Sequence, residues 1–140
     1  MLRYEHYNMN QPKKDIESLD EVKVLVNTFY DKIRIDDVLG PIFNERIKDQ
    51  WPVHLEKMYR FWQTVLLNEH SYQGSPFRPH AQLPVGSEHF NHWLSLFEST
   101  LNELFEGPKA DEALWRAKKM AEMFQIKITY YRQNKSKPIL

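Results

Sequence analysis

The sequence predicts an all-α protein, and three observations support this prediction. Apolar residues recur at three- and four-residue spacing in four long segments, as on the buried face of a helix. No segment of useful length alternates between apolar and polar residues as a strand does. Glycine and proline lie mainly at the ends of the four segments, where helices start and stop. With 140 residues, the chain is long enough to form one domain with a buried core.

The first helix is expected to begin after Asp15 or Ser18, because both residue types are good N-caps. Its apolar residues at helical spacing are Ile16, Leu19, Val22, Val26, Phe29, Tyr30 and Ile33. Gly40 and Pro41 then force a turn, and the short segment "IFNERI" (42–47) follows it.

The second helix is expected to open with Pro52, because a proline in the first turn leaves no N–H unpaired there. Its apolar residues, in a segment that ends near Leu67, are Met58, Phe61, Trp62 and Val65.

The third helix is predicted from about Ser87 and the fourth from Pro108, with "EGP" (106–108) separating them. The apolar face of the third helix comprises Phe90, Trp93, Leu94, Phe97, Leu101 and Leu104. That of the fourth comprises Ala113, Leu114, Ala117, Met120, Ala121, Phe124, Ile128 and Tyr131.

The segment "YQGSPFRPHAQLPVGS" (72–87) interrupts the helical pattern. It is longer than the 2–8 residues that usually join helices in a bundle, and long loops in compact domains are often functional. Pro76, Pro79 and Pro84 stiffen it. Its apolar residues Tyr72, Phe77, Leu83 and Val85 can dock on the helices. We therefore expect an ordered loop, with its one histidine, His80, as the residue of interest.

The amino-acid composition excludes several classes of partner and cofactor. Lys plus Arg (19) equals Asp plus Glu (19), so no bulk field favours nucleic acid or a membrane surface as partner. No apolar run reaches the roughly 20 residues of a membrane span, and the first residues do not resemble a secretory signal. The absence of cysteine excludes disulfides, iron–sulfur clusters and thiolate-bound or covalently attached haem. We expect a cytoplasmic protein. Its aromatic content of 14% exceeds what a small helical bundle needs.

Two histidines are candidates for chemistry. His80 is either an ordinary polar residue or a metal ligand; a carbonyl freed by the prolines would accept its second N–H and fix the ring. His54 shares a helical face with Met58, Phe61 and Val65, so it is either a histidine at the edge of the core or a polar group over an apolar cavity. No closely spaced ligand pair surrounds either histidine, which leaves a protein-only zinc site with little support.

Tyr30 and Trp93 are polar aromatic residues in otherwise apolar helical faces. A buried tyrosine hydroxyl and a buried indole N–H each need a hydrogen-bond partner. Such residues commonly serve only the core, so neither decides the function alone.

The segments "FYDKIRIDDVLGPIFN", "WPVHLEKMYRFW", "YQGSPFRPH" and "HFNHWLSLF", in this order and spacing, resemble the truncated globins of the class III (P-type) branch. The absence of Gly-Gly pairs also fits this branch. The resemblance covers residues 15–133, which would form the globin domain between an N-terminal extension (1–14) and a C-terminal tail (134–140).

The resemblance implies a globin-like fold, a truncated two-over-two helical sandwich around a haem b. By the same resemblance His80 is the proximal iron ligand, and Tyr30, His54 and Trp93 form the distal ligand-binding side. The implied haem-pocket residues are Phe29, Phe43, Met58, Phe61, Trp62 and Phe90. Met58 replaces the branched aliphatic residue that is common in the family, which would alter the pocket. Lys57 and Arg78 are candidates for haem propionate contacts by position only.

The implied function is reversible binding of O₂, CO or NO at the free axial position of the iron. Tyr30 and Trp93 would donate hydrogen bonds to the ligand, while His54 would either donate or swing outward as a gate. An alternative is a haem enzyme with peroxidase-like or nitric-oxide dioxygenation activity, which an electron-donating reductase would serve. A haem-free helical interaction module is the third interpretation.

Overall fold

A computed structural model describes residues 12–77, 80–81 and 83–134. These residues form five α-helices and no strand, which confirms the prediction of an all-α protein. The helices are α2 (Leu19–Ile35), α3 (Gly40–Ile47), α4 (Trp51–Leu67), α5 (Ser87–Leu104) and α6 (Pro108–Gln133). Pro52 lies in the first turn of α4 as expected, but the helix begins one residue earlier, at Trp51. None of the helices in the described ranges is long and apolar enough to cross a membrane.

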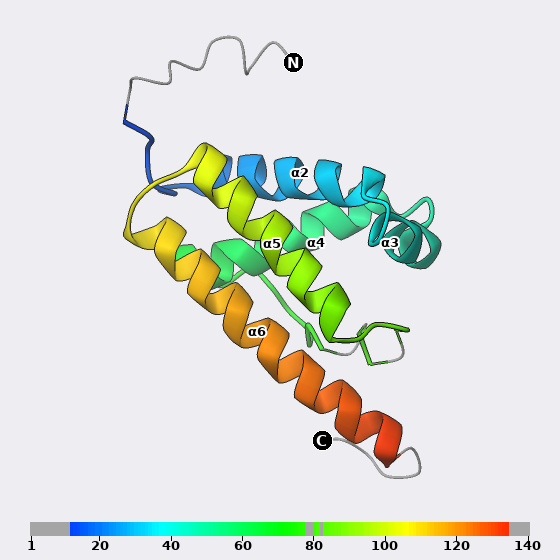
Figure 1. Ribbon diagram of the computed structural model, residues 1–140. Coiled ribbons are helices and arrows are strands. Elements are labelled where there is room, and N and C mark those ends of the chain that lie inside the picture. Colours follow the sequence, from blue (N-terminus) through cyan, green and yellow to red (C-terminus); the bar gives the residue numbers. More distant parts are fainter. Residues whose placement is uncertain (1–11, 78–79, 82, 135–140) are drawn as a thin grey trace.

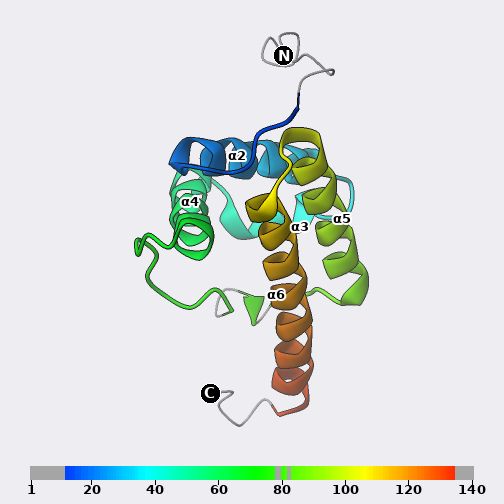
Figure 2. The ribbon, with the colours of Figure 1, turned by 90° about the vertical axis from the view of Figure 1, so that its left-hand side faces the viewer.

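The helices pack in two layers (Figures 1 and 2). Helices α2 and α4 contact each other in one layer, and α5 and α6 contact each other in the other layer. Contacts of α2 with α5 and of α4 with α6 join the two layers, while the short α3 packs beside α2. The C-terminal part of α6 extends beyond the other helices (Figure 1).

The hydrophobic core of the described residues is divided into two clusters. The main cluster is built on α2, α4, α5 and the first half of α6 and includes Phe29, Trp62 and Phe97. The second cluster comprises Phe77, Val85, Phe90, Ala121, Phe124 and Ile128. Leu94 and Met120 pack against both clusters. Side chains of α5, α6 and the loop after α4 therefore form a second hydrophobic cluster, distinct from the main core.

The loop between α4 and α5 is fastened at both ends. The Thr64 hydroxyl accepts the backbone N–H groups of Ser71 and Tyr72, each at 3.0 Å. At the other end the Arg132 guanidinium of α6 donates to the carbonyls of Leu83 at 2.9 Å and Val85 at 3.0 Å. In its described part the loop docks as predicted, because Phe77 and Val85 are buried.

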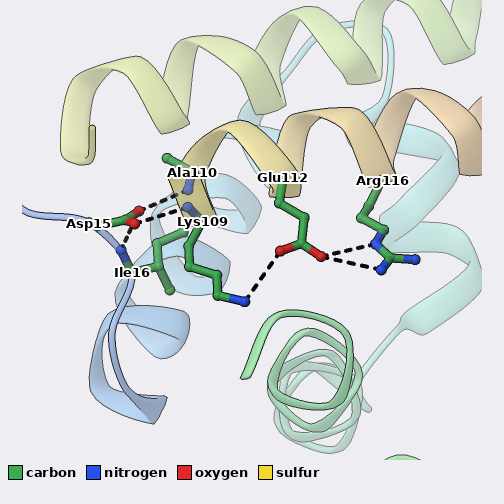
Figure 3. A network of polar contacts seen from close by, with 6 residues as sticks. All are labelled: Asp15, Ile16, Lys109, Ala110, Glu112 and Arg116. Atoms are coloured by element: carbon green, nitrogen blue, oxygen red, sulfur yellow. Dashed lines mark hydrogen bonds and ion pairs between the residues drawn. The ribbon is translucent and has the colours of Figure 1, made fainter. Parts of the chain in front are cut away.

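The predicted helix cap at Asp15 acts on a different helix. Ser18 occupies the N-cap position of α2, but its hydroxyl bonds to the Glu21 carboxylate rather than to the backbone. The Asp15 carboxylate instead accepts the backbone N–H groups of Lys109 and Ala110, both at 2.9 Å (Figure 3). These are free donors in the first turn of α6, where a negative charge is also favoured by the helix dipole.

Gly107, which precedes α6, leaves room for this contact. It has φ +145°, and a Cβ atom built there would lie 2.5 Å from the Asp15 Cγ atom. A larger residue at this position would therefore be strained in its backbone and would displace the carboxylate.

We expect Asp15→Ala to lower the free energy of unfolding by about 1–2 kcal/mol, because it removes two charge-assisted bonds to the α6 terminus. Urea denaturation followed by circular dichroism measures this change. The exposed Asp37 provides a control, since Asp37→Ala removes a carboxylate from a turn. Equal stability of the two variants would contradict the capping role.

Candidate functional site

A cavity of about 530 Å³ lies between the two clusters of the core. Its volume falls within the range of about 300–1,000 Å³ that is typical of small-molecule and cofactor sites. All eleven residues proposed from the sequence that the structure describes line this one cavity: Phe29, Tyr30, Phe43, His54, Lys57, Met58, Phe61, Trp62, His80, Phe90 and Trp93. Arg78 lies outside the described residues.

His80 is held in one orientation by the loop. Its Nδ1 lies 2.7 Å from the carbonyl oxygen of Pro76, which can only accept a hydrogen bond. Nδ1 therefore carries the hydrogen, and Nε2 of the neutral ring keeps its lone pair. The Phe124 ring of α6 packs against the imidazole at 4.7 Å between centroids. Burial lowers the pKa of His80, the hydrogen bond to Pro76 opposes this shift, and the positive charge of Arg46 adds to it.

His54 enters the cavity from α4 with a buried nitrogen that has no partner. Its Nε2 is shielded from solvent and forms no hydrogen bond within the part of the chain that the structure describes. Burial lowers the pKa of His54 to about 4, and repulsion from Lys57, and from His80 when it is protonated, contributes to the shift. The ring is therefore neutral at pH 7, and the residue lines the cavity.

Tyr30 and Trp93 lie on either side of Phe29. The Phe29 ring packs edge-on against Tyr30 at 5.0 Å and against Trp93 at 5.4 Å. Burial raises the pKa of Tyr30, so its phenol keeps its proton at neutral pH. Neither the Tyr30 hydroxyl nor the Trp93 indole N–H is hydrogen-bonded to another of the described residues. Two donors are thus available on the wall of the cavity.

The remaining walls are aromatic and apolar. Phe43 contributes from α3, at 6.1 Å between its ring centroid and that of Tyr30. Phe61 and Trp62 contribute from α4, with Trp62 stacked on Phe97 at 5.2 Å. Met58 lies one turn after His54 and also lines the cavity. Flat apolar side chains of this kind suit a large planar molecule.

Phe124, Arg46 and Trp51 are among the residues in or beside the cavity wall that were not proposed from the sequence as site residues. Phe124 and Arg46 line the cavity directly, and Trp51 packs edge-on against both Tyr30, at 5.8 Å, and His54, at 5.6 Å. The position of Trp51 three residues before His54 put both on one face of α4 and was a usable signal. No local pattern could connect Phe124 to His80, because they are far apart in the sequence.

No group of three or more His, Cys, Asp or Glu side chains within residues 12–77, 80–81 and 83–134 could hold a metal ion.

Comparisons with known proteins agree on one family. A sequence profile of the bacterial-like globins matches residues 15–128. The chain is 37% identical over 116 residues to the group 3 truncated hemoglobin of Campylobacter jejuni, covering 80% of this chain and 91% of that protein. The crystal structure of the group III truncated hemoglobin from Campylobacter jejuni matches with a TM-score of 0.76 and 36% identity, covering 83% of this chain and 94% of that one.

Two helical layers around an aromatic cavity, with histidines reaching it from α4 and from the following loop, define a globin. The chain belongs to the bacterial-like globin family and, within it, to the group III truncated haemoglobins. The resemblance and the two-over-two fold inferred from the sequence are both confirmed.

Globins bind haem, and the residues of this cavity fit that group. The aromatic walls match a flat porphyrin. His80 presents an imidazole nitrogen with a free lone pair, because its other nitrogen is bound to Pro76. The buried Nε2 of His54 has no partner among the described residues, and a group bound in the cavity that this histidine lines would offer one.

We expect His54 to make the haem-free protein less stable by about 2 kcal/mol at pH 5 than at pH 7. In the unfolded chain this histidine binds a proton near its ordinary pKa of 6.5, but in the folded chain only near 4. The unfolded state therefore binds more protons as the pH falls through this range, and unfolding is favoured.

Urea denaturation of haem-free protein from pH 7 to pH 5 measures the effect. His54→Gln should show a correspondingly weaker dependence on pH, whereas His70→Gln, which removes an exposed loop histidine, should follow the wild type. Parallel curves for the wild type and His54→Gln would show that burial does not keep His54 neutral.

Proposed function

We propose that this protein binds haem b through His80 and reversibly binds O₂ and other diatomic ligands on the opposite side of the cavity. The observation that carries the proposal is the hydrogen bond of 2.7 Å between His80 Nδ1 and the Pro76 carbonyl. It fixes the tautomer and the ring orientation, as hydrogen bonds to the second nitrogen commonly do for ligand histidines. The Phe124 ring supports the imidazole from α6.

A haem held by His80 would supply an iron that binds a diatomic molecule. The chain's contribution is a set of hydrogen-bond donors near that molecule. O₂ gains negative charge when it binds, and donors that are already oriented stabilise such charge without reorganising. The Tyr30 hydroxyl and the Trp93 indole N–H are the donors we assign to this role. Together they would slow O₂ release by about 10- to 100-fold.

His54 would complete the distal side. Its neutral ring at pH 7 can donate to a ligand only through the nitrogen that carries the hydrogen. Met58, one turn further along α4, would shape the apolar part of the same space. The haem propionates would lie near the exposed cations Lys57 and Arg46, both of which line the cavity, with Arg78 as a further candidate from the sequence.

A haem enzyme is the second candidate, and the same donors favour it. Strong hydrogen bonding to peroxide assists cleavage of its O–O bond, so a cavity with a phenol, an indole N–H and an imidazole suits peroxidase-like or nitric-oxide chemistry. Kinetics separate the two functions. Fast O₂ release indicates a carrier, whereas very slow release together with fast turnover of peroxide or nitric oxide indicates an enzyme.

We expect His80→Gly to lose haem or to bind it without the five-coordinate ferrous spectrum of the wild type, because the imidazole that would hold the iron is gone. Added imidazole should restore that spectrum by filling the space of the lost side chain. Absorption spectra of protein produced with haem supply measure both effects. The exposed His70 gives the control, His70→Gly. A wild-type ferrous spectrum for His80→Gly without imidazole would refute the assignment.

We expect Tyr30→Phe to release O₂ roughly tenfold faster than the wild type, because one hydrogen bond to a charged acceptor is lost. Stopped-flow displacement of O₂ by CO gives the dissociation rate. Tyr130 is exposed on α6, so Tyr130→Phe is the matched control for loss of a phenol hydroxyl. An unchanged rate in Tyr30→Phe would show that this hydroxyl does not reach the ligand.

A further inference from the structure

The orientation of His54 is set by packing. Neither of its ring nitrogens is hydrogen-bonded to another of the described residues, and Nε2 is buried. Its aromatic contacts are edge-on packing against Tyr30 at 5.1 Å and against Trp51 at 5.6 Å, with interplanar angles of 89° and 90°. Whatever holds these two rings therefore also holds the imidazole.

Trp51 contacts both of the other rings. It lies 5.8 Å from Tyr30 and is only 5% exposed, at the start of α4. The contact with His54 spans one turn of the same helix, while the contact with Tyr30 crosses to α2. Trp51 is thus common to the two side chains that we assign to the distal side of the cavity.

Trp51 is in turn anchored from outside. Its indole Nε1–H donates to the Asn44 Oδ1 atom of α3 at 3.2 Å. The Arg34 guanidinium of α2 lies over the ring at 4.6 Å, in cation–π geometry. The Asn44 amide also donates to the Arg34 carbonyl at 3.1 Å, which closes a small network across three helices.

This network faces the surface. Arg34 and Asn44 are exposed and, together with Asp31 and Ile35, line a shallow hollow there. Trp51 therefore lies between that surface and the cavity: it contacts Arg34 and Asn44 on the surface side and His54 on the cavity side.

We propose that Trp51 is a positioning residue that holds the His54 ring inward over the cavity, and that Arg34 and Asn44 fix Trp51 for this purpose. The inference rests on the proposed binding of diatomic ligands. Without the indole ring, His54 loses its edge-on aromatic contact at the start of α4, moves outward more often, and admits ligand faster.

The test uses the CO complex of the full haem-loaded protein. The infrared C–O stretching band reports which polar groups face the ligand, and flash photolysis gives the rate of CO association. The variants are Trp51→Leu, which removes the aromatic ring, and Trp51→Phe, which keeps one. Trp115 is half-exposed on α6 and does not line the cavity, so Trp115→Leu is the matched control for loss of a tryptophan.

We expect Trp51→Leu to split or shift the C–O band and to speed CO association by roughly 2- to 10-fold, the effect of losing one aromatic contact. Trp51→Phe and Trp115→Leu should keep the wild-type band. In a His54→Leu background, Trp51→Leu should change the association rate less than twofold, because its effect acts through His54.

An unchanged band and rate in Trp51→Leu, or an equal effect with and without His54, would overturn the proposal. If Trp51→Leu does not fold, Arg34→Met and Asn44→Ala test the proposal instead. Both keep the indole, and each removes one of its contacts, the cation–π contact or the hydrogen bond. We expect them to shift the band in one direction, and wild-type bands in both would also overturn it. Failure of the proposed function is distinguishable, because the wild type itself would then take up no haem or bind no CO.

Discussion

The fold is governed by a cavity that its own side chains leave open between two hydrophobic clusters. The main cluster joins α2, α4 and α5, and the second joins the loop to α6 and the start of α5. Leu94 and Met120 pack against both clusters, but the cavity of about 530 Å³ leaves the other side chains that face it without close packing partners. A flat apolar molecule in contact with both clusters would supply these contacts. Haem binding and the stability of the fold are therefore linked through the same surfaces.

The prolines of the loop have a chemical as well as a mechanical role. They prevent a continuous helix, which leaves the Pro76 carbonyl free to accept the hydrogen of His80 Nδ1. The loop itself is held by Thr64 of α4 and Arg132 of α6. Both helical layers thus hold the described ends of the loop, and the loop's own Pro76 carbonyl orients the imidazole.

Local patterns revealed much of this structure from the sequence. Apolar spacing predicted the four long helices to within a residue or two, and the proline-rich interruption pointed to His80 and to a freed carbonyl beside it. Gly40 and Pro41 were expected to form a turn, but they are the first two residues of α3. Contacts between segments far apart in the sequence could not be predicted from these local patterns. Asp15 and Ser18 were both candidates for the cap of the first helix; Ser18 occupies that position, while Asp15 binds the N–H groups of Lys109 and Ala110. The approach of Phe124 to His80 likewise depends on how α6 crosses the loop, which spacing within one helix cannot specify.

The Asp15 contact has a consequence for how the chain can be shortened. A fragment starting at Leu19 would contain every described side chain that lines the cavity. It would nevertheless lack the carboxylate that closes the first turn of α6, the helix that carries Phe124 against the His80 ring. Removal of residues 12–18, none of which lines the cavity, would thus loosen the contact of α6 with the His80 ring from a distance. A fragment that holds haem securely must therefore be longer than a fragment that only contains the residues around the cavity.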